Sequence, residues 1–209
     1  DGGTVWRNCH TGVRHALEDL GYQYQYVAAA QVEADASTLD EYKVLLLPLA
    51  ACLSDAHVAA IRAFVERGGL VIADGKTGLL TGNGVVRESR PLDDVFGVKS
   101  ATGAEVLAAA PTSTELDLGG GVVVTAGVLE TDLEMTDANA DGDVAGTPLW
   151  VSHRFGSGRA ILLNVSFALV NAVRNTEKQA AVVTGVEDML RLSGVTPPAG
   201  LTTPDGAPQ

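Results

Sequence analysis

The sequence predicts an α/β fold in which a parallel sheet is flanked by helices and extended by an antiparallel β-hairpin. Two short apolar runs, Glu41–Pro48 and Leu70–Ala73, have the composition of strands that are covered on both faces. The residues between them have helical spacing, and a strand, a helix and a strand with short connections form a parallel βαβ unit. Later in the chain, two strand patterns flank the turn Gly156–Gly158, which predicts the hairpin.

Length and composition limit the class of protein. The chain has 209 residues, enough for one large domain or two small ones, and 46% of them are hydrophobic and 19% charged, which excludes disorder of the whole chain. With 14 Lys and Arg against 26 Asp and Glu, the net charge is −12. This charge opposes binding to nucleic acid and to anionic membranes. No apolar run approaches the roughly 18–20 residues of a membrane-spanning helix, and no signal peptide is visible.

The N-terminal part predicts one helix and one strand. Apolar residues recur at helical spacing over Cys9–Leu20, and Gly21 follows as a stop. Tyr22–Val27 then alternates with period 2, which predicts a strand with one polar face. Cys9 and Cys52 allow at most one disulfide, and the spacing does not decide whether they pair.

The βαβ unit has clear boundaries. Ser54 is a good N-cap, and Asp55 follows in the first turn. Gly68-Gly69 ends the helix before the second strand. The buried stripe of this helix is predicted to comprise Val58, Ile61, Phe64 and Val65.

The second half of the chain is predicted to be mostly strands. A Gly-rich segment, Gly75–Val86, is followed by a helical turn around Leu92–Phe96 that ends at Gly97. Strand patterns then dominate from Ala104 to Val165, and a last helix spans about Thr176 to Leu192. We predict a domain over residues 1–194 and a Pro-rich linker or tail over residues 195–209.

The residues after the second strand invite a comparison with known catalytic motifs. Gly75-Lys76-Thr77 resembles the end of a phosphate-binding loop, but the preceding residues form a strand and cannot wrap phosphates. A nucleophilic enzyme would place Cys or Ser at this strand end, and the sequence offers Asp74. We predict that Asp74 hydrogen-bonds to loop amides and stabilises the turn.

Two acidic segments admit a metal or acid–base interpretation. Asp137, Asn139 and Asp141 match the first half of an EF-hand calcium loop, but Pro148 stands where the last ligand should be. The alternative is a polar loop that leads into the hairpin. Glu130, Asp132 and Glu134 are predicted to form a solvated strand face.

An ordered series of motifs resembles the class I glutamine amidotransferase-like domain, and most closely the trimerisation domain of glycoside hydrolase family 42 β-galactosidases. The resemblance extends over about residues 12–192 and rests on Tyr42–Pro48, Leu53–Asp55, Phe64–Ile72, Leu92–Val98, Gly146–Pro148 and His153–Arg159. It implies a flavodoxin-like sheet. Amidotransferases of this fold carry a nucleophilic Cys after the strand, where this chain has Ala73 or Asp74. The family also has a strand before the first helix, for which Thr4-Val5-Trp6 is a poor substitute.

This resemblance implies a non-catalytic domain of a larger, carbohydrate-active protein that serves domain packing or oligomerisation. The expected partners are neighbouring domains of the same polypeptide, with a homo-oligomer also allowed, and we predict no cofactor, no metal and no catalytic residue. The alternative is a binding module for a small molecule or carbohydrate. Its ligand would occupy the crevice at the ends of the parallel strands, lined by Asp74, Lys76 and Thr77.

Overall fold

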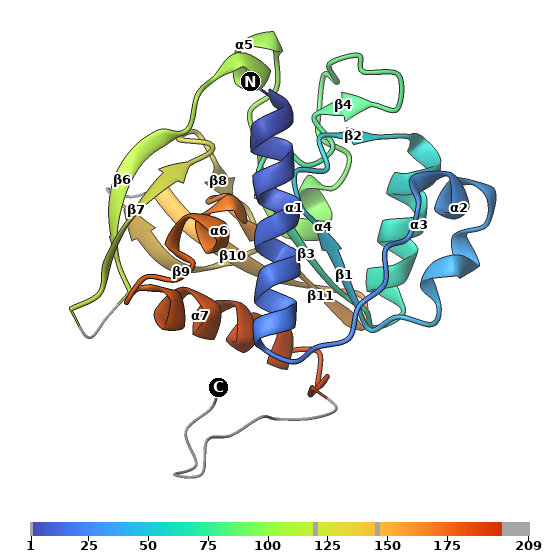
Figure 1. The fold of residues 1–209 in the computed structure, drawn as a ribbon. Coiled ribbons are helices and arrows are strands. Elements are labelled where there is room, and N and C mark those ends of the chain that lie inside the picture. Colours follow the sequence, from blue (N-terminus) through green and yellow to red (C-terminus); the bar gives the residue numbers. More distant parts are fainter. Residues whose placement is uncertain (1, 119–120, 145–146, 198–209) are drawn as a thin grey trace. The chain divides into compact units, whose positions relative to one another are not determined.

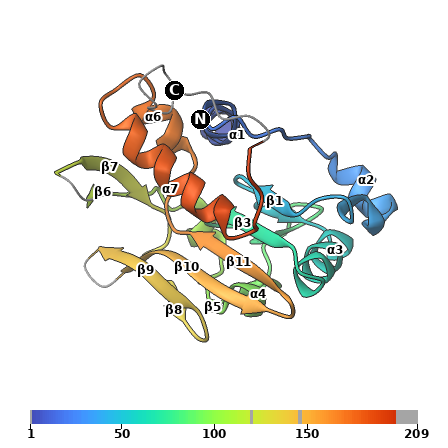
Figure 2. The same cartoon turned by 90° about the horizontal axis from the view of Figure 1, so that it is seen from below.

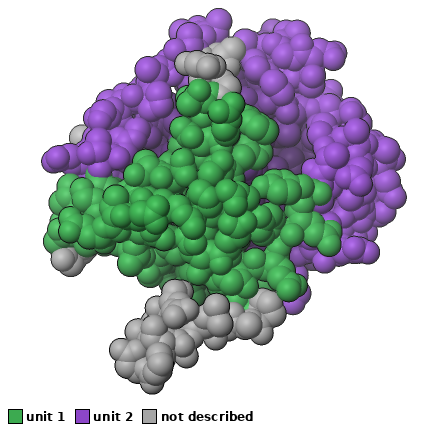
Figure 3. Space-filling view, viewed as in Figure 1, with its two compact units in different colours: residues 1–26, 117–124, 167–209 green, residues 27–116, 125–166 purple. Residues whose placement is uncertain are grey.

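The structure, a computed structural model, describes residues 2–118, 121–144 and 147–197. The Pro-rich segment predicted from residue 195 falls largely outside them. The chain forms two compact units, which Figure 3 distinguishes by colour. Unit 1 comprises residues 1–26, 117–124 and 167–209, and unit 2 comprises residues 27–116 and 125–166.

Unit 2 contains a five-stranded sheet with the strand order β1-β3-β11-β10-β9 (Figure 2). β1 and β11 both run parallel to β3, and β10 runs antiparallel to β11 and β9. The strands are β1 (Val44–Leu47), β3 (Leu70–Asp74), β9 (Asn139–Val144), β10 (Thr147–Phe155) and β11 (Gly158–Leu163). The mixed α/β class, the parallel βαβ unit and the late hairpin are therefore confirmed.

Helix α3 (Asp55–Glu66) joins β1 to β3 and begins at the predicted cap. The Ser54 hydroxyl accepts a hydrogen bond from His57 N–H at 3.3 Å, and the Ser54 N–H donates to His57 Nδ1 at 3.1 Å. The helix buries three of its four predicted stripe residues, Ile61, Phe64 and Val65. These side chains share one core cluster with residues of β3, β10, β11 and helix α4 (Asp93–Phe96).

The remaining elements of the middle part are short (Figure 1). Helix α4 ends at Gly97, whose φ of 67° is left-handed, as expected for the predicted stop. Residues 104–108 are helical rather than extended, since Ala, Glu and Leu are good helix formers. The other elements are α2 (Ala29–Ala34), η1 (Ala36–Leu39), β2 (Cys52–Leu53), β4 (Leu80–Thr81), β5 (Val98–Lys99), α5 (Ala104–Ala108), β6 (Thr112–Asp117), β7 (Val123–Val128) and β8 (Glu134–Met135).

The described residues of unit 1 form three helices, α1 (Gly2–Asp19), α6 (Ala168–Val173) and α7 (Gln179–Arg191). α1 approaches the start of α6 closely, because a Cβ on Gly12 would lie 2.2 Å from the Phe167 carbonyl oxygen. The Asp19 carboxylate accepts hydrogen bonds from Arg174 and Gln179, both at 2.9 Å. α7 begins three residues later than the predicted helix, and α6 was not predicted.

Two predictions for the N-terminal part were wrong. α1 begins at Gly2 rather than Cys9 and includes Thr4-Val5-Trp6, so these residues are not a strand. The buried Cys9, Gly12 and Ala16 recur at helical spacing along this helix, and the Trp6 ring contacts that of His10 one turn later, with centroids 4.1 Å apart. Tyr22–Val27 is not a strand either, because its alternation has no partner strand in the described part of the chain.

Two further predictions concern the cysteines and membrane-spanning helices. Cys9 is buried and Cys52 is exposed, and no disulfide joins them in the described structure. Among the described residues, no helix is both long and apolar enough to cross a bilayer.

Candidate functional site

The strand end singled out by the sequence lies at the carboxyl edge of the parallel strands. Asp74 is the last residue of β3 and pairs with Leu163 at the end of β11. The turn that follows contains Lys76, whose φ of 67° is in the left-handed region. The strained residue after the strand is therefore Lys76, and Ala73 and Asp74, which stand where amidotransferases carry their nucleophile, remain within β3.

Asp74 forms the hydrogen bond to a loop amide that was predicted. Its side chain is fully buried, and Oδ1 accepts a hydrogen bond from Leu49 N–H at 2.5 Å. Leu49 itself has a φ of 50°, so the carboxylate holds an unfavourable backbone conformation in the loop after β1. The Asp74 carbonyl oxygen accepts from Thr77 Oγ1 at 2.6 Å, which closes the turn.

Lys76 is tied to the protein at both its backbone and its side chain. Its N–H donates to Glu130 Oε1 at 2.9 Å, and Nζ donates to the Ala109 carbonyl oxygen at 2.7 Å. Burial lowers the pKa of the Lys76 ammonium group, although the charge of Glu130 acts in the opposite direction.

The partner of this turn, Glu130, was placed wrongly by the sequence analysis. Asp132 and Glu134 are exposed as predicted, but Glu130 is buried and forms an ion pair with Arg90 at 2.8 Å. The two side chains are 3% and 2% exposed, respectively. Glu130 follows β7 where the strand pattern has ended, so alternation did not indicate which way its side chain points.

Asn164 fixes the backbone of Glu130. Its Oδ1 accepts from Glu130 N–H at 2.9 Å, and its Nδ2 donates to the Glu130 carbonyl oxygen at 2.8 Å. Nδ2 also donates to the Pro148 carbonyl oxygen at 3.0 Å. Asn164 is 1% exposed, and its position directly after β11 is the only signal that sequence offered for this role.

The charges of Arg90 and Glu130 also act on a carboxyl group of helix α4, that of Asp93. Asp93 accepts hydrogen bonds from Ser100 N–H at 2.9 Å and from Ser100 Oγ at 2.8 Å. Burial nevertheless raises the pKa of the Asp93 carboxyl group. The charges of Arg90 and Glu130 act on this pKa in opposite directions.

We call Asp74, Lys76, Thr77, Arg90, Glu130 and Asn164 the carboxyl-edge cluster. Its six residues contain no Cys or His, so it holds no pair of a nucleophile and a general base of the usual kind. Its charged groups bind one another and the backbone. Asp74, Lys76 and Thr77 are at most 9% exposed, so their burial gives no support to the open crevice that the binding interpretation requires.

Neither interpretation of residues 137–141, a calcium loop or a polar loop, describes Asn139 and Asp141. Asn139 and Asp141 lie in β9, where Asn139 pairs with Ser152 and Asp141 with Trp150 of β10. An EF-hand binds its ion with a loop that winds around it, whereas β9 is extended and paired along β10, so the backbone here does not have the form of an EF-hand loop. In the part of the chain that the structure describes, no group of three metal-ligating side chains was found.

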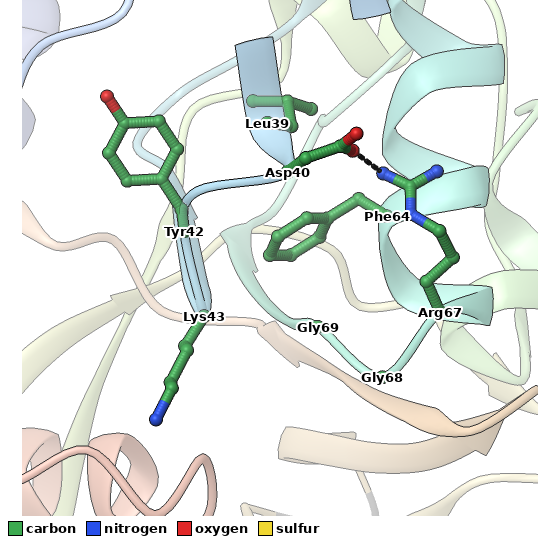
Figure 4. A pocket seen from close by; sticks show the side chains of 8 residues that line it. All are labelled: Leu39, Asp40, Tyr42, Lys43, Phe64, Arg67, Gly68 and Gly69. Atoms are coloured by element: carbon green, nitrogen blue, oxygen red, sulfur yellow. Dashed lines mark hydrogen bonds and ion pairs between the residues drawn. The ribbon is translucent and has the colours of Figure 1, made fainter. Parts of the chain in front are cut away.

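A small hollow lies at the opposite, amino edge of the same strands (Figure 4). Its volume is about 190 Å³, and an exposed ion pair between Asp40 and Arg67 lies on it. The aromatic ring of Phe64 lies between this pair and Gly69 in the view of Figure 4. The lining contains no Ser, Cys or His, and consists of Leu39, Asp40, Tyr42, Lys43, Phe64, Arg67, Gly68 and Gly69.

The fold and the carboxyl-edge cluster define an α/β domain whose carboxyl edge is filled by its own side chains. The family of β-galactosidase trimerisation domains matches residues 19–192, and the chain belongs to this family. The family resemblance seen in the sequence is therefore confirmed. No match was found among curated proteins.

Solved structures with a similar fold include two β-galactosidases. The enzyme from Bacillus circulans sp. alkalophilus has a TM-score of 0.67 at 17% identity, over 95% of this chain and 28% of that one. The enzyme from Halorubrum lacusprofundi has a TM-score of 0.61 at 18% identity, over 90% and 26%. The chain thus spans about a quarter of these enzymes.

The fold also occurs in a chain of similar extent. The cytoplasmic protein STM1381 from Salmonella typhimurium LT2 has a TM-score of 0.55 at 14% identity, over 86% of each chain. At such low identity, these likenesses describe the fold alone.

Proposed function

We propose that this chain is a non-catalytic domain of a larger glycoside hydrolase and serves domain packing and trimer formation. Membership in the trimerisation domain family carries this proposal. The similarity to about a quarter of each β-galactosidase chain is consistent with a protein whose chemistry lies in another domain.

The carboxyl edge supports the non-catalytic part of the proposal. The side chains at the end of β3 and just after it form structural hydrogen bonds, such as those of Asp74 with Leu49 N–H and of Lys76 with the Ala109 carbonyl oxygen. Ala73 and Asp74, at the positions where the resemblance places the amidotransferase thiol, carry no thiol, and the lysine in the turn that follows has a hydrogen-bonded ammonium group.

We also propose that the sheet is an abbreviated flavodoxin-like sheet. Its strands β1, β3 and β11 are parallel neighbours, and α3 crosses between the first two. On this proposal, residues 1–194 form the domain, and residues 195–209 lead to a neighbouring domain.

Sedimentation of the purified chain over a wide concentration range tests the oligomeric role. We expect association to a species of three times the monomer mass, and a chain that stays monomeric at the highest concentration contradicts trimer formation by this domain alone. The same samples should hydrolyse neither glutamine nor aryl β-galactosides. Measurable turnover that scales with enzyme concentration would overturn the non-catalytic assignment.

A further inference from the structure

The Glu130 carboxylate is held in the way that proteins hold a bound anion. One backbone donor, the Lys76 N–H, and one cationic donor, Arg90 Nη1, approach the same oxygen Oε1 at 2.9 and 2.8 Å. Backbone N–H groups of turns and buried guanidinium groups are common ligands of carboxylates. The location is the carboxyl edge of parallel strands, where open α/β sheets bind ligands.

The surroundings of this carboxylate are preformed by the fold. Asn164 clamps the backbone of Glu130 from both sides, so its side chain is delivered from a fixed point. Gly75 leaves room for the approach, since a Cβ there would lie 2.9 Å from Leu129 and 3.4 Å from Glu130 Oε1.

The fit between Glu130 and Arg90 is incomplete. Arg90 Nε and Nη2 and Glu130 Oε2 are buried, and they make no hydrogen bond within the described structure. A carboxylate that is free to turn can receive two parallel N–H bonds from one guanidinium group, whereas the tethered Glu130 uses one oxygen for both of its donors. The site therefore offers more hydrogen-bond donors than the Glu130 carboxylate uses.

We infer that the carboxyl edge is a binding site for a small carboxylate anion, which the chain fills with its own Glu130 side chain. Arg90 and the Lys76 N–H are the ligands of this site. As long as Glu130 is present, the site is closed to other anions. Replacement of Glu130 by Ala removes two carbons and two oxygens, the size of acetate, and leaves the Arg90 cation and the Lys76 N–H to bind acetate or the smaller formate.

Chemical rescue tests this inference. Thermal unfolding of the wild type, of Glu130→Ala and of Glu134→Ala is followed by circular dichroism in sodium formate and in sodium chloride of equal ionic strength. Glu134→Ala is the matched control, because it removes an exposed carboxylate that lies 3.3 Å from Lys99. We expect formate at saturating concentration to raise the melting temperature of Glu130→Ala by about 5 °C over chloride. The wild type and the control should show no such difference.

A second pair of variants keeps the test decisive. The double variant Arg90→Met/Glu130→Ala should lose the formate response, because the cationic ligand is absent. Where Glu130→Ala does not fold in chloride, formate should restore its native spectrum, and Glu130→Ser should respond in the same way. Equal effects of formate and chloride on Glu130→Ala, or variants that stay unfolded in formate, would overturn the inference.

Discussion

The two edges of the parallel strands in unit 2 are stabilised in different ways. At the carboxyl edge, charged and polar side chains are buried and bind one another, as in the pair of Arg90 and Glu130. At the amino edge, the backbone of the hairpin turn packs against the end of α3. Ser157 N–H donates to the Glu66 carbonyl oxygen at 3.0 Å, and Arg159 N–H donates to that of Gly69 at 3.1 Å.

This difference between the two edges predicts which substitutions should lower the free energy of unfolding most. The ion pair at the amino edge, Asp40 with Arg67, is about half exposed, so solvent screens it. The pair at the carboxyl edge is shielded, so the loss of either partner leaves an uncompensated buried charge. Substitutions at the carboxyl edge should therefore act through charge, and those at the amino edge through steric fit.

The largest effect is expected for Arg90→Met. This change leaves the buried Glu130 carboxylate without its cation and should lower the free energy of unfolding by about 3–5 kcal/mol. Equilibrium unfolding in urea measures the difference. A loss below about 1 kcal/mol would mean that the pair is solvated and that the two edges do not differ in this respect.

A steric effect of similar rank is expected for Gly158→Ala at the amino edge. A Cβ there would lie 2.2 Å from the Val65 carbonyl oxygen and 2.4 Å from that of Gly69, and neither backbone group can move easily. We expect a loss of about 3 kcal/mol in the free energy of unfolding. Gly185→Ala is the control, because a Cβ on Gly185 of α7 meets nothing within 4 Å. The control should gain up to about 1 kcal/mol from helix propensity.

A smaller effect is expected for Asp74→Asn. The amide retains an oxygen for Leu49 N–H but loses the charge, so the free energy of unfolding should fall by about 1 kcal/mol. Any activity of a longer protein that contains this domain should stay nearly unchanged. A fall in that activity by orders of magnitude, with the fold intact, would make Asp74 a catalytic residue.

The smallest effect is expected for Arg67→Met. The Asp40–Arg67 pair is exposed, so its removal should change the free energy of unfolding by less than about 1 kcal/mol. The change should shrink further at high salt concentration. A loss as large as that of Arg90→Met would show that exposure does not separate the two edges.

The amino edge could be predicted from sequence because its signals are local. Gly68-Gly69 ends α3, and the turn Gly156–Gly158 joins β10 to β11, as each pattern indicated. The carboxyl edge could not be predicted in the same way. Glu130 lies 54 residues from Lys76 and 34 residues from Asn164 along the chain, so no periodicity links them.

In the N-terminal part, local patterns indicated strands that the structure does not contain. The alternation of Tyr22–Val27 is a valid strand signal, but a strand forms only where a neighbouring strand supplies hydrogen bonds. Trp6 and Val5 have a preference for strands, yet both lie in α1 with exposed side chains, and the Trp6 ring contacts that of His10 one turn later. Strand propensity therefore does not decide the conformation of either segment.

A double-mutant cycle on Arg90 and Glu130 tests most directly whether the carboxyl edge is closed by its own ion pair. The free energy of unfolding is measured for the wild type, Arg90→Met, Glu130→Leu and the double variant. We predict that each single change costs several kcal/mol, and that the double change costs clearly less than both together, because apolar groups replace the pair. Strictly additive losses would mean that Arg90 and Glu130 do not interact, and would contradict an edge that is closed by this ion pair.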